Sequence, residues 1–557
     1  MKTLLPFVLV LVSLTSRADN TRYHFFVQFH DKELNYVNFD EPETYLSQRC
    51  IDRRKRLNIP IDSLDLPVTA SYVENIKKPS IQVRYVSKWL NGAVISTSSK
   101  DTAYRLKIKF YVDDVVYLGK TVEKTNKTGR QSLSNDLSLT KEHYGDGYKQ
   151  LEMLNGPQLH NQGYKGNGVL IAVFDAGFKR LNGLSLFRHL AENNRLVYTY
   201  DVVDLESDVY DDDDHGLHVM GCMAAYQKSK MIGSAPEASY ALFRTEAAQY
   251  ENWLEELNWV RAAEMADSMG VDIINSSLGY NTFDEDVLNH RHEDLDGKTT
   301  FISRGASTAG DKGILVVNSA GNDGNKDWGK LDFPADVENI LVVGAVDMNL
   351  EVPAFSSPGP TADFRIKPDI AALGRRTTIA TTYGVGTGNG TSYSCPIVAG
   401  LMACLWEANP QLTAERLRLI AIQSAHMSLE PDNAAGHGLP DFNLALVMTG
   451  KHSDFNYANS SVIGLTEPAY NTTEIVTLYT PNQKHVQARL NLPKRFLFFR
   501  YKKTKWLDEK EVGPEGFTKF MLPLYNIPSG KSVELEFLQR QADGKFETFE
   551  VRSGTMR

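Results

Sequence analysis

A short stretch at residues 389–400, NGTSYSCPIVAG, places a hydroxyl group where a helix is expected to begin. Ser392 follows Gly390 and Thr391, and Pro396 opens an apolar run. Glycine permits a tight turn and proline is tolerated in a first helical turn, so the spacing predicts a buried helix that starts here. A serine at a helix start is most often a cap. The alternative is a nucleophile, which needs a base, a group orienting that base and an oxyanion donor elsewhere in the chain.

A base and a carboxylate are both present closer to the N-terminus. His215 and His218 open an apolar helical segment after an acidic loop, DDDDHGLHVMG, and a histidine placed there can act as a general base near neutral pH. Two histidines at this spacing could instead hold a metal ion, but the spacing alone is weak support. Asp175 ends the apolar run VLIAVFD, where a buried charge is costly without a partner. A histidine N–H would supply that partner.

Asn322, in VVNSAGNDG, is the candidate oxyanion donor. An asparagine that follows Ala-Gly at the end of a strand is usually a turn former. Its carboxamide can alternatively donate a hydrogen bond to an oxygen that becomes negatively charged during a reaction.

The scaffold between residues 141 and 450 must bring these groups together. Four short apolar runs alternate there with helical segments: VLIAVFD, VDIINSSLG, ILVVNSAG and ILVVGAVD. Strands that are apolar on both faces and separated by helices predict an α/β fold, a parallel sheet with helices on both faces. Functional groups gather at the carboxyl ends of such strands. Those ends carry Asp175, then Ser277, Leu278 and Gly279, then Ser319, Ala320 and Gly321.

The order Asp, His, Asn, Ser on this scaffold resembles the subtilisin-like serine peptidases, the subtilase family S8. VFDAG resembles the family's Asp motif, HGLHVMG its His motif, NSSLG its substrate-binding strand, SAGNDG its oxyanion strand and NGTSYSCPIVAG its Ser motif. The resemblance implies an endopeptidase that hydrolyses polypeptides and requires no cofactor for the chemistry. It implies a catalytic triad of Asp175, His215 and Ser392, in the chain order of subtilisin. The first histidine of the motif is the base, which selects His215 over His218.

The same resemblance assigns the remaining site residues. Asn322 becomes the oxyanion donor, and the substrate-binding residues are Ser277, Leu278, Gly279, Ser319, Ala320 and Gly321. Three positions depart from the family pattern: Ala176 after the Asp, Leu217 between the histidines, and YSC after Ser392. None removes a proton-transfer group, but they leave open a catalytically weak relative that acts as a binding protein. A metallopeptidase using both histidines is disfavoured, because no HExxH motif or third ligand accompanies them.

The region before the peptidase-like part resembles a leader. MKTLLPFVLVLVSLTSRA predicts a cleaved signal peptide at residues 1–18, and no later segment is long and apolar enough to span a membrane. Residues 19–140 alternate strand-like and helical runs, which predicts a small α+β domain that ends in a polar linker. The resemblance implies a propeptide that inhibits the enzyme intramolecularly and is removed by it. SQRCIDRRKRLNIPI and SKWLNG resemble leaders of secreted Bacteroidetes subtilases, so we expect an extracellular, periplasmic or surface location.

The other features of the sequence are weaker. Alternating segments over 451–557 predict an all-β C-terminal domain. The net charge of −9 does not favour nucleic-acid binding, and the run Arg53–Arg56 is expected on a solvated helix face. The acidic loop Asp201–Asp214 is expected to be solvated rather than to bind structural calcium, because consecutive aspartates lack a defined ligand spacing. Free buried thiols are favoured over a disulfide such as Cys222–Cys404; the cysteines are Cys50, Cys222, Cys395 and Cys404.

Overall fold

The structure is a computed structural model that describes residues 21–32, 39–122, 141–428 and 430–449, and the backbone of strands between 461 and 555. The predicted signal peptide and nearly all of the predicted linker lie outside the described residues.

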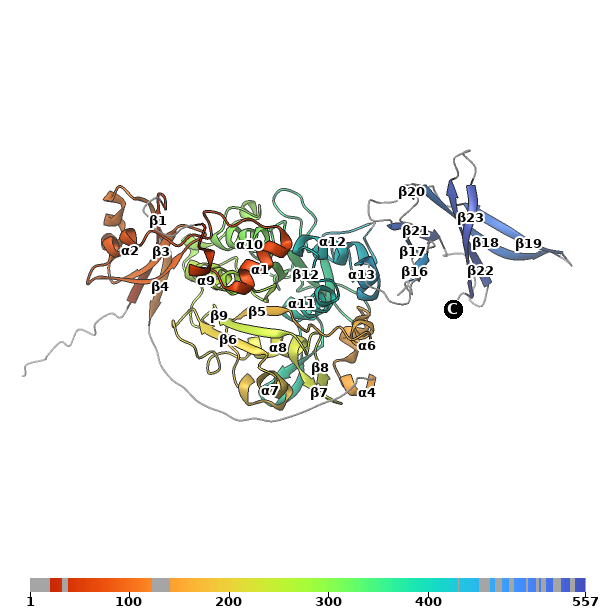
Figure 1. The fold of residues 1–557 in the computed structure, drawn as a ribbon, viewed down its shortest axis with the longest axis horizontal. Helices are drawn as coiled ribbons and strands as arrows, with labels where there is room; N and C mark the ends of the chain where they lie inside the picture. The colour runs from red at the N-terminus through yellow and green to blue at the C-terminus, as the bar shows by residue number, and fades with distance from the viewer. Residues whose placement is uncertain are drawn as a thin grey trace, which may run out of the picture.

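A seven-stranded parallel sheet forms the centre of the peptidase-like region (Figure 1). Its strand order is β13-β12-β11-β10-β5-β9-β6, and each neighbouring pair is parallel. Nearly all residues of the six strands other than β6 are buried, which explains why they are apolar on both faces. The strands are β5 (Leu170–Asp175), β6 (Leu196–Asp201), β9 (Ser239–Arg244), β10 (Ile273–Ser276), β11 (Leu315–Ser319), β12 (Leu341–Val346) and β13 (Ile370–Leu373).

Helices cover both faces of this sheet, as predicted. Helices α8 (His215–Ala224) and α11 (Thr391–Ala408) pack on one face, and all but one residue of α11 is buried. Helices α9 (Trp253–Met269) and α10 (Phe301–Asp311) pack on the other. The remaining elements of this region are α4 (Lys141–Tyr144), α5 (Tyr148–Glu152), α6 (Gly156–Asn161), α7 (Arg188–Glu192), β7 (Tyr226–Gln227), β8 (Met231–Ile232), β14 (Thr377–Thr381), β15 (Gly384–Gly388), α12 (Ala414–Ser424) and α13 (Phe442–Met448).

The N-terminal region, residues 21–122, is the small α+β unit that the sequence predicts. Its antiparallel sheet has the order β2-β3-β1-β4 and packs through Phe26, Tyr85 and Trp89 against the layer of α9 and α10. This contact adds a fourth layer to the molecule (Figure 1). The elements are β1 (Thr21–Phe29), α1 (Gln48–Leu57), α2 (Ala70–Ile76), β2 (Ile81–Ser87), β3 (Gly92–Thr97), α3 (Lys100–Tyr104) and β4 (Val112–Val122).

Two arginines of α1 correct the prediction of a solvated basic face. Arg53 and Arg54 are each 1 % exposed and reach α9, where both contact the fully buried Asp267, at 2.6 and 2.9 Å. Burial would raise the pKa of Asp267, but the charges of Lys88, Arg53 and Arg54 lower it below its ordinary value. The arginine run therefore attaches the N-terminal region to the peptidase-like region, which no local pattern in the sequence indicates.

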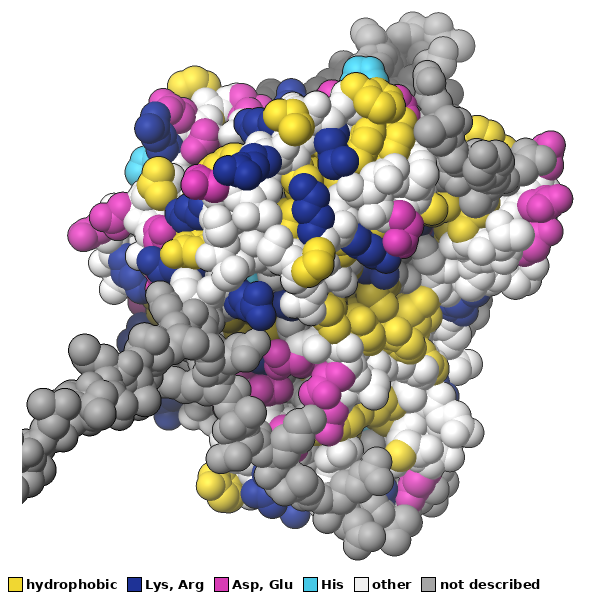
Figure 2. All heavy atoms as spheres, turned by 90° about the vertical axis from the view of Figure 1, so that its left-hand side faces the viewer, with side chains coloured by type: hydrophobic (Ala, Val, Ile, Leu, Met, Phe, Trp, Pro, Cys, Tyr) yellow, Lys and Arg dark blue, Asp and Glu magenta, His cyan; other side chains and the backbone are white. Residues whose placement is uncertain are grey.

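The structure also tests several smaller predictions. All four cysteines are free and buried, as predicted. Asp201, the first residue of the acidic loop, is buried and paired with Arg244 at 2.6 Å, so the loop is not solvated throughout. No helix of the described residues is long and apolar enough to cross a membrane. On the face of Figure 2, lysine and arginine side chains are interspersed with acidic and apolar ones.

The C-terminal part is described only as strand backbone. Strands β16, β17 and β21 form one antiparallel sheet, and β18, β19, β22 and β23 form another, with β20 paired to β18. A separate all-β domain over 451–557 stays a prediction. The strands are β16 (Ser461–Leu465), β17 (Thr473–Tyr479), β18 (His485–Phe496), β19 (Phe499–Trp506), β20 (Lys510–Glu511), β21 (Phe517–Pro523), β22 (Ser532–Arg540) and β23 (Phe546–Thr555).

The buried ion cluster gives a first test. Replacing Asp267 with alanine leaves Arg53 buried without a carboxylate and Arg54 paired only with Asp65, which should lower the free energy of unfolding by about 3–5 kcal/mol. Urea denaturation of the full-length chain, followed by circular dichroism, measures the change. Asp52→Ala, on the exposed side of α1, is the control and should change it little. A loss below about 1 kcal/mol for Asp267→Ala would contradict the assigned role of the cluster.

Candidate active site

The carboxylate of Asp175 and the ring of His215 meet at the carboxyl edge of the parallel sheet. Asp175 ends β5 and is fully buried, and His215 begins α8. Nδ1 of His215 lies 2.8 Å from Asp175 Oδ1, which also accepts the backbone N–H of Ala176 at 2.9 Å. This contact leaves Nε2 as the ring nitrogen that can exchange a proton with a ligand. His218 is not part of the pair, because its Nε2 lies 3.8 Å from Oδ1 of Asp214 instead.

Ser392 lies at the same edge, in the first turn of α11. The helix begins at Thr391, and its N-cap is Gly390, whose φ of 153° favours glycine, so Ser392 is not the cap residue. Ser392 Oγ donates to the backbone oxygen of Ser277 at 3.4 Å, and Ser277 Oγ donates to the backbone oxygen of Ser392 at 3.0 Å. These reciprocal contacts tie the start of α11 to the residue that follows β10.

The carboxamide of Asn322 has a fixed orientation. Its Oδ1 accepts the backbone N–H of Thr391 at 2.9 Å, and the hydroxyl of Thr391 accepts the backbone N–H of Gly321 at 3.2 Å. Since Oδ1 is engaged in this way, Nδ2 is the atom left to donate to a ligand. Thr391, which the sequence analysis did not single out, thus positions a neighbouring strand end as well as starting the helix.

One cleft of about 620 Å³ joins these groups. Ala320 does not line it: the residue is fully buried, and its backbone N–H donates to Val343 at 3.0 Å. Side chains alternate in direction at a strand end, which places Ala320 in the core between two cleft residues. The predicted site residues that do line the cleft are His215, Ser277, Leu278, Gly279, Ser319, Gly321, Asn322 and Ser392.

Residues at the positions that depart from the family pattern fill space around His215 and His218. The Tyr393 ring lies 6.0 Å from the His215 ring and 6.2 Å from the His218 ring, between centroids. Leu217 is fully buried in the core. Among the described residues, no group of three or more His, Cys, Asp or Glu side chains is arranged to hold a metal ion.

The charge on His215 is controlled by opposing effects. Burial lowers its pKa, but the charge and the hydrogen bond of Asp175 raise it more, with smaller contributions from Glu246 and Asp213, so that the pKa is raised to about 9. The neutral ring, which is the form that can accept a proton, is therefore populated increasingly as the pH rises through 9.

Sequence analysis missed the acidic residues of the cleft. The missed carboxylates are Glu246, Glu251, Glu255, Asp323 and Asp332, and Asp213 was considered only as part of the acidic loop. Asp323 could have been noticed because it directly follows Asn322. Asp332, in LDFPAD, carries no local signal, since only the tertiary fold brings it beside Gly279 and Gly321.

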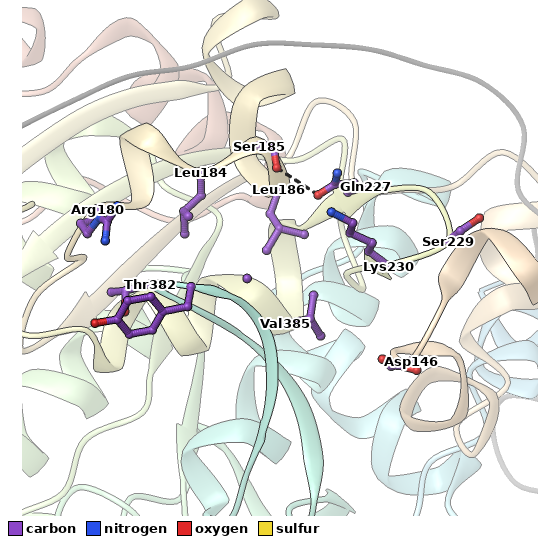
Figure 3. Close-up of a pocket in the computed structure, with 12 residues that line it drawn as sticks. Asp146, Arg180, Leu184, Ser185, Leu186, Gln227, Ser229, Lys230, Thr382 and Val385 are labelled. Carbon is purple, nitrogen blue, oxygen red and sulfur yellow. Dashed lines mark hydrogen bonds between the residues drawn. The ribbon is translucent and has the colours of Figure 1, made fainter.

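A second cavity, of about 560 Å³, lies between residues 180–186, the β7–β8 turn and the β14–β15 hairpin (Figure 3). Ser185 Oγ donates to Gln227 Oε1 at 3.1 Å at one side of it. None of the predicted site residues lines this cavity.

The sequence also matches known proteins. Residues 166–438 match the family model for the subtilase family, and residues 24–134 match that for the peptidase S8 propeptide domain of Bacteroidota. The serine protease AprX of Bacillus subtilis is 29 % identical over 46 % of this chain and 61 % of its own length. Subtilisin E of the same organism is 29 % identical over 54 % of this chain and 74 % of its own. MycP1 from Mycobacterium smegmatis aligns in structure with a TM-score of 0.42 and 21 % identity, over 54 % of this chain and 84 % of its own.

The pairing of Asp175 with His215 gives the second test. Asp175→Asn removes the charge that raises the histidine pKa and leaves the burial that lowers it, so the pKa should fall from about 9 to below its ordinary value of 6.5. NMR of ring-labelled histidine, recorded from pH 5 to 10, measures this shift. Asp214→Asn, beside His218, is the matched control and should leave the His215 titration in place. A wild-type His215 that titrates near 6.5 would contradict the assignment.

Proposed function

Because the chain belongs to the subtilase family of serine endopeptidases, we propose that it is a secreted enzyme which hydrolyses peptide bonds through Asp175, His215 and Ser392. The observation that carries the proposal is the 2.8 Å contact of His215 with a buried carboxylate, in the cleft that also holds Ser392 and Asn322. The proposed chemistry uses protein side chains and water, with no cofactor.

In the proposed reaction Ser392 Oγ attacks the carbonyl carbon of the scissile peptide bond. Its proton passes to Nε2 of His215, and Asp175 stays ionised and stabilises the imidazolium. His215 then delivers the proton to the leaving amine, and water hydrolyses the acyl-enzyme by the same route in reverse. Ser392 Oγ is directed at the backbone oxygen of Ser277, at 3.4 Å, so in the proposed reaction its hydroxyl turns toward Nε2 of His215.

The developing negative charge would be stabilised by two donors. One is Nδ2 of Asn322, whose orientation Thr391 fixes. The other is the backbone N–H of Ser392, which lies in the first turn of α11 and so has no acceptor within the helix. Backbone from Ser277 to Gly279 follows a buried strand and lines the cleft, which suits it to pair with an extended substrate.

We further propose that the N-terminal region is a propeptide that inhibits the enzyme and is removed by it. The last strand of that region, β4, runs past the beginning of α9, where Asn252 Nδ2 contacts the backbone oxygen of Lys120 at 3.4 Å. The next residue before Asn252, Glu251, lines the cleft. The described chain therefore leaves β4 near one end of the cleft.

The nucleophile is tested by replacing Ser392 with alanine. The variant should lose labelling by a fluorophosphonate and all proteolysis, and its precursor should keep residues 19 onward attached, because self-cleavage needs the same triad. Mass spectrometry of protein from a host of low protease background measures both effects. Ser394→Ala, two residues along the same helix, is the control and should still be labelled. Equal processing of Ser392→Ala and wild type would show that another protease does the cutting.

The oxyanion donor is tested by replacing Asn322 with leucine. Because its donor serves the transition state, kcat should fall by roughly 10²–10³ with little change in KM. Steady-state kinetics on one peptide substrate separates the two constants. If KM rose while kcat stayed constant, Asn322 would be a structural turn residue.

A further inference from the structure

The cleft that contains Ser392 is strongly acidic. Six carboxylates line it, whereas Lys326 is the single lysine or arginine among its described lining residues. A cleft lined by charges of one sign concentrates ligands of the opposite sign. The excess of carboxylates over cationic side chains indicates which kind of substrate side chain the cleft accepts.

Asp332 lies beside Gly279 and Gly321, which belong to the two backbone segments that line the cleft near Ser392 and Asn322. A Cβ on Gly321 would lie 2.1 Å from Asp332 Oδ2, and one on Gly279 would lie 2.6 Å from Asp332 Cβ. The carboxylate thus sits between the two backbone segments that border the cleft, in space that only glycine leaves open. Asp332 is 6 % exposed, and no lysine or arginine of the described residues forms an ion pair with it. A buried carboxylate that faces a cleft without a counter-ion is suited to receive a cation.

A second carboxylate strengthens this site. Asn281 Nδ2 donates to Asp332 Oδ1 at 2.7 Å and to Asp323 Oδ2 at 2.6 Å, so one amide group holds both carboxylates side by side. Burial and the charge of Asp323 raise the pKa of Asp332 to about 7. Lys326 contacts the other oxygen of Asp323 at 2.5 Å, through a side chain that is 65 % exposed. A cation entering from the cleft would relieve the repulsion between the two carboxylates.

We propose that the cleft selects peptides with an arginine or lysine immediately before the scissile bond, and that Asp332 and Asp323 bind that side chain. The inference rests on the proposed function, because Asn322 would receive the carbonyl oxygen of that same residue. The side chain leaves the backbone next to this carbonyl. Since Gly321 precedes Asn322 and lies against Asp332, the side chain is directed to the carboxylate pair. Arginine is preferred, because its planar fork can bind two carboxylates at once.

Two further carboxylates of the cleft, those of Glu246 and Glu251, favour additional basic residues in the same peptide. Glu255 is already occupied, since it accepts the backbone N–H groups of Ala247 and Asn252 at 3.0 and 3.1 Å. Glu246 and Glu251 line the same cleft, and burial raises their pKa values to about 8 and about 7. Cationic side chains at other substrate positions would stabilise their ionised forms.

The chain contains a matching sequence where self-cleavage is expected. Between residues 125 and 145 the lysine and arginine residues are Lys127, Arg130 and Lys141, and Arg130 is the only arginine. Maturation by cleavage after Arg130 would leave Gln131 as the first residue of the enzyme.

Matched fluorogenic peptides test the specificity. They differ only in the residue before the scissile bond, which is arginine, lysine, leucine or glutamate. The wild-type enzyme should have the highest kcat/KM for arginine, then lysine, with glutamate lowest. Asp332→Asn should reduce the arginine-to-leucine ratio by roughly 30-fold or more, as expected when one partner of a buried charge pair is removed. Asp323→Asn should reduce it less, and Asp327→Asn, on the exposed surface outside the cleft, should leave it unchanged.

Fluorophosphonate labelling of Ser392 distinguishes a failure of the proposed specificity from a failure of the proposed peptidase activity. A labelled wild-type enzyme that cleaves the leucine peptide as well as the arginine peptide would overturn the specificity and leave the peptidase in place. An unlabelled protein that cleaves no peptide would overturn the proposed function. N-terminal sequencing adds a test that needs no cleft variant: a mature chain starting after arginine or lysine, absent from Ser392→Ala, supports the proposal, and a start after any other residue overturns it.

Discussion

The buried charge of Asp175 is the constraint on which the rest of the site depends. A carboxylate at the end of a central strand is stable only if donors meet it there, and the ring of His215 and the backbone of Ala176 do so. That requirement places the N-terminus of α8 over the sheet edge. Because β10 and β11 run parallel to β5, their own ends reach the same edge, and Ser277 and Asn322 follow from them. The parallel sheet thus gathers residues that are far apart in the sequence.

The sequence predicted what depends on local patterns. The apolar runs correspond to buried parallel strands, and the motif around Ser392 corresponds to the start of a buried helix. Motif recognition also selected residues that line the cleft, together with Asp175, which is buried behind His215, and Ala320, which lies in the core. Ala320 stands inside a motif, but which way its side chain points depends on the path of the backbone. A motif identifies residues that are adjacent in sequence. Which of these residues lie on the same surface depends on the fold.

Long-range electrostatics was not predictable. The arginine pair of α1 has the composition of a solvated face, yet Asp267, more than two hundred residues away, makes it part of the core. Asp332 is similar, because the room for its carboxylate is left by two glycines in the segments that follow β10 and β11. In both cases the charged residues carry no distinctive pattern in the sequence. Only the tertiary structure gives the arginines a buried partner and gives Asp332 its position at the cleft. The two sites differ in outcome, since the arginine cluster is satisfied internally and the Asp332 pair is open to the cleft.

The four buried thiols have a practical consequence for studying this molecule. Burial raises the pKa of Cys222, Cys395 and Cys404 and keeps them in the unreactive thiol form, and Cys50 is shielded in the same way. The folded protein therefore presents none of its own cysteines to maleimides. A single cysteine introduced at Tyr383, which is 94 % exposed on the β14–β15 hairpin, would carry a fluorophore or a surface tether without removal of any native cysteine.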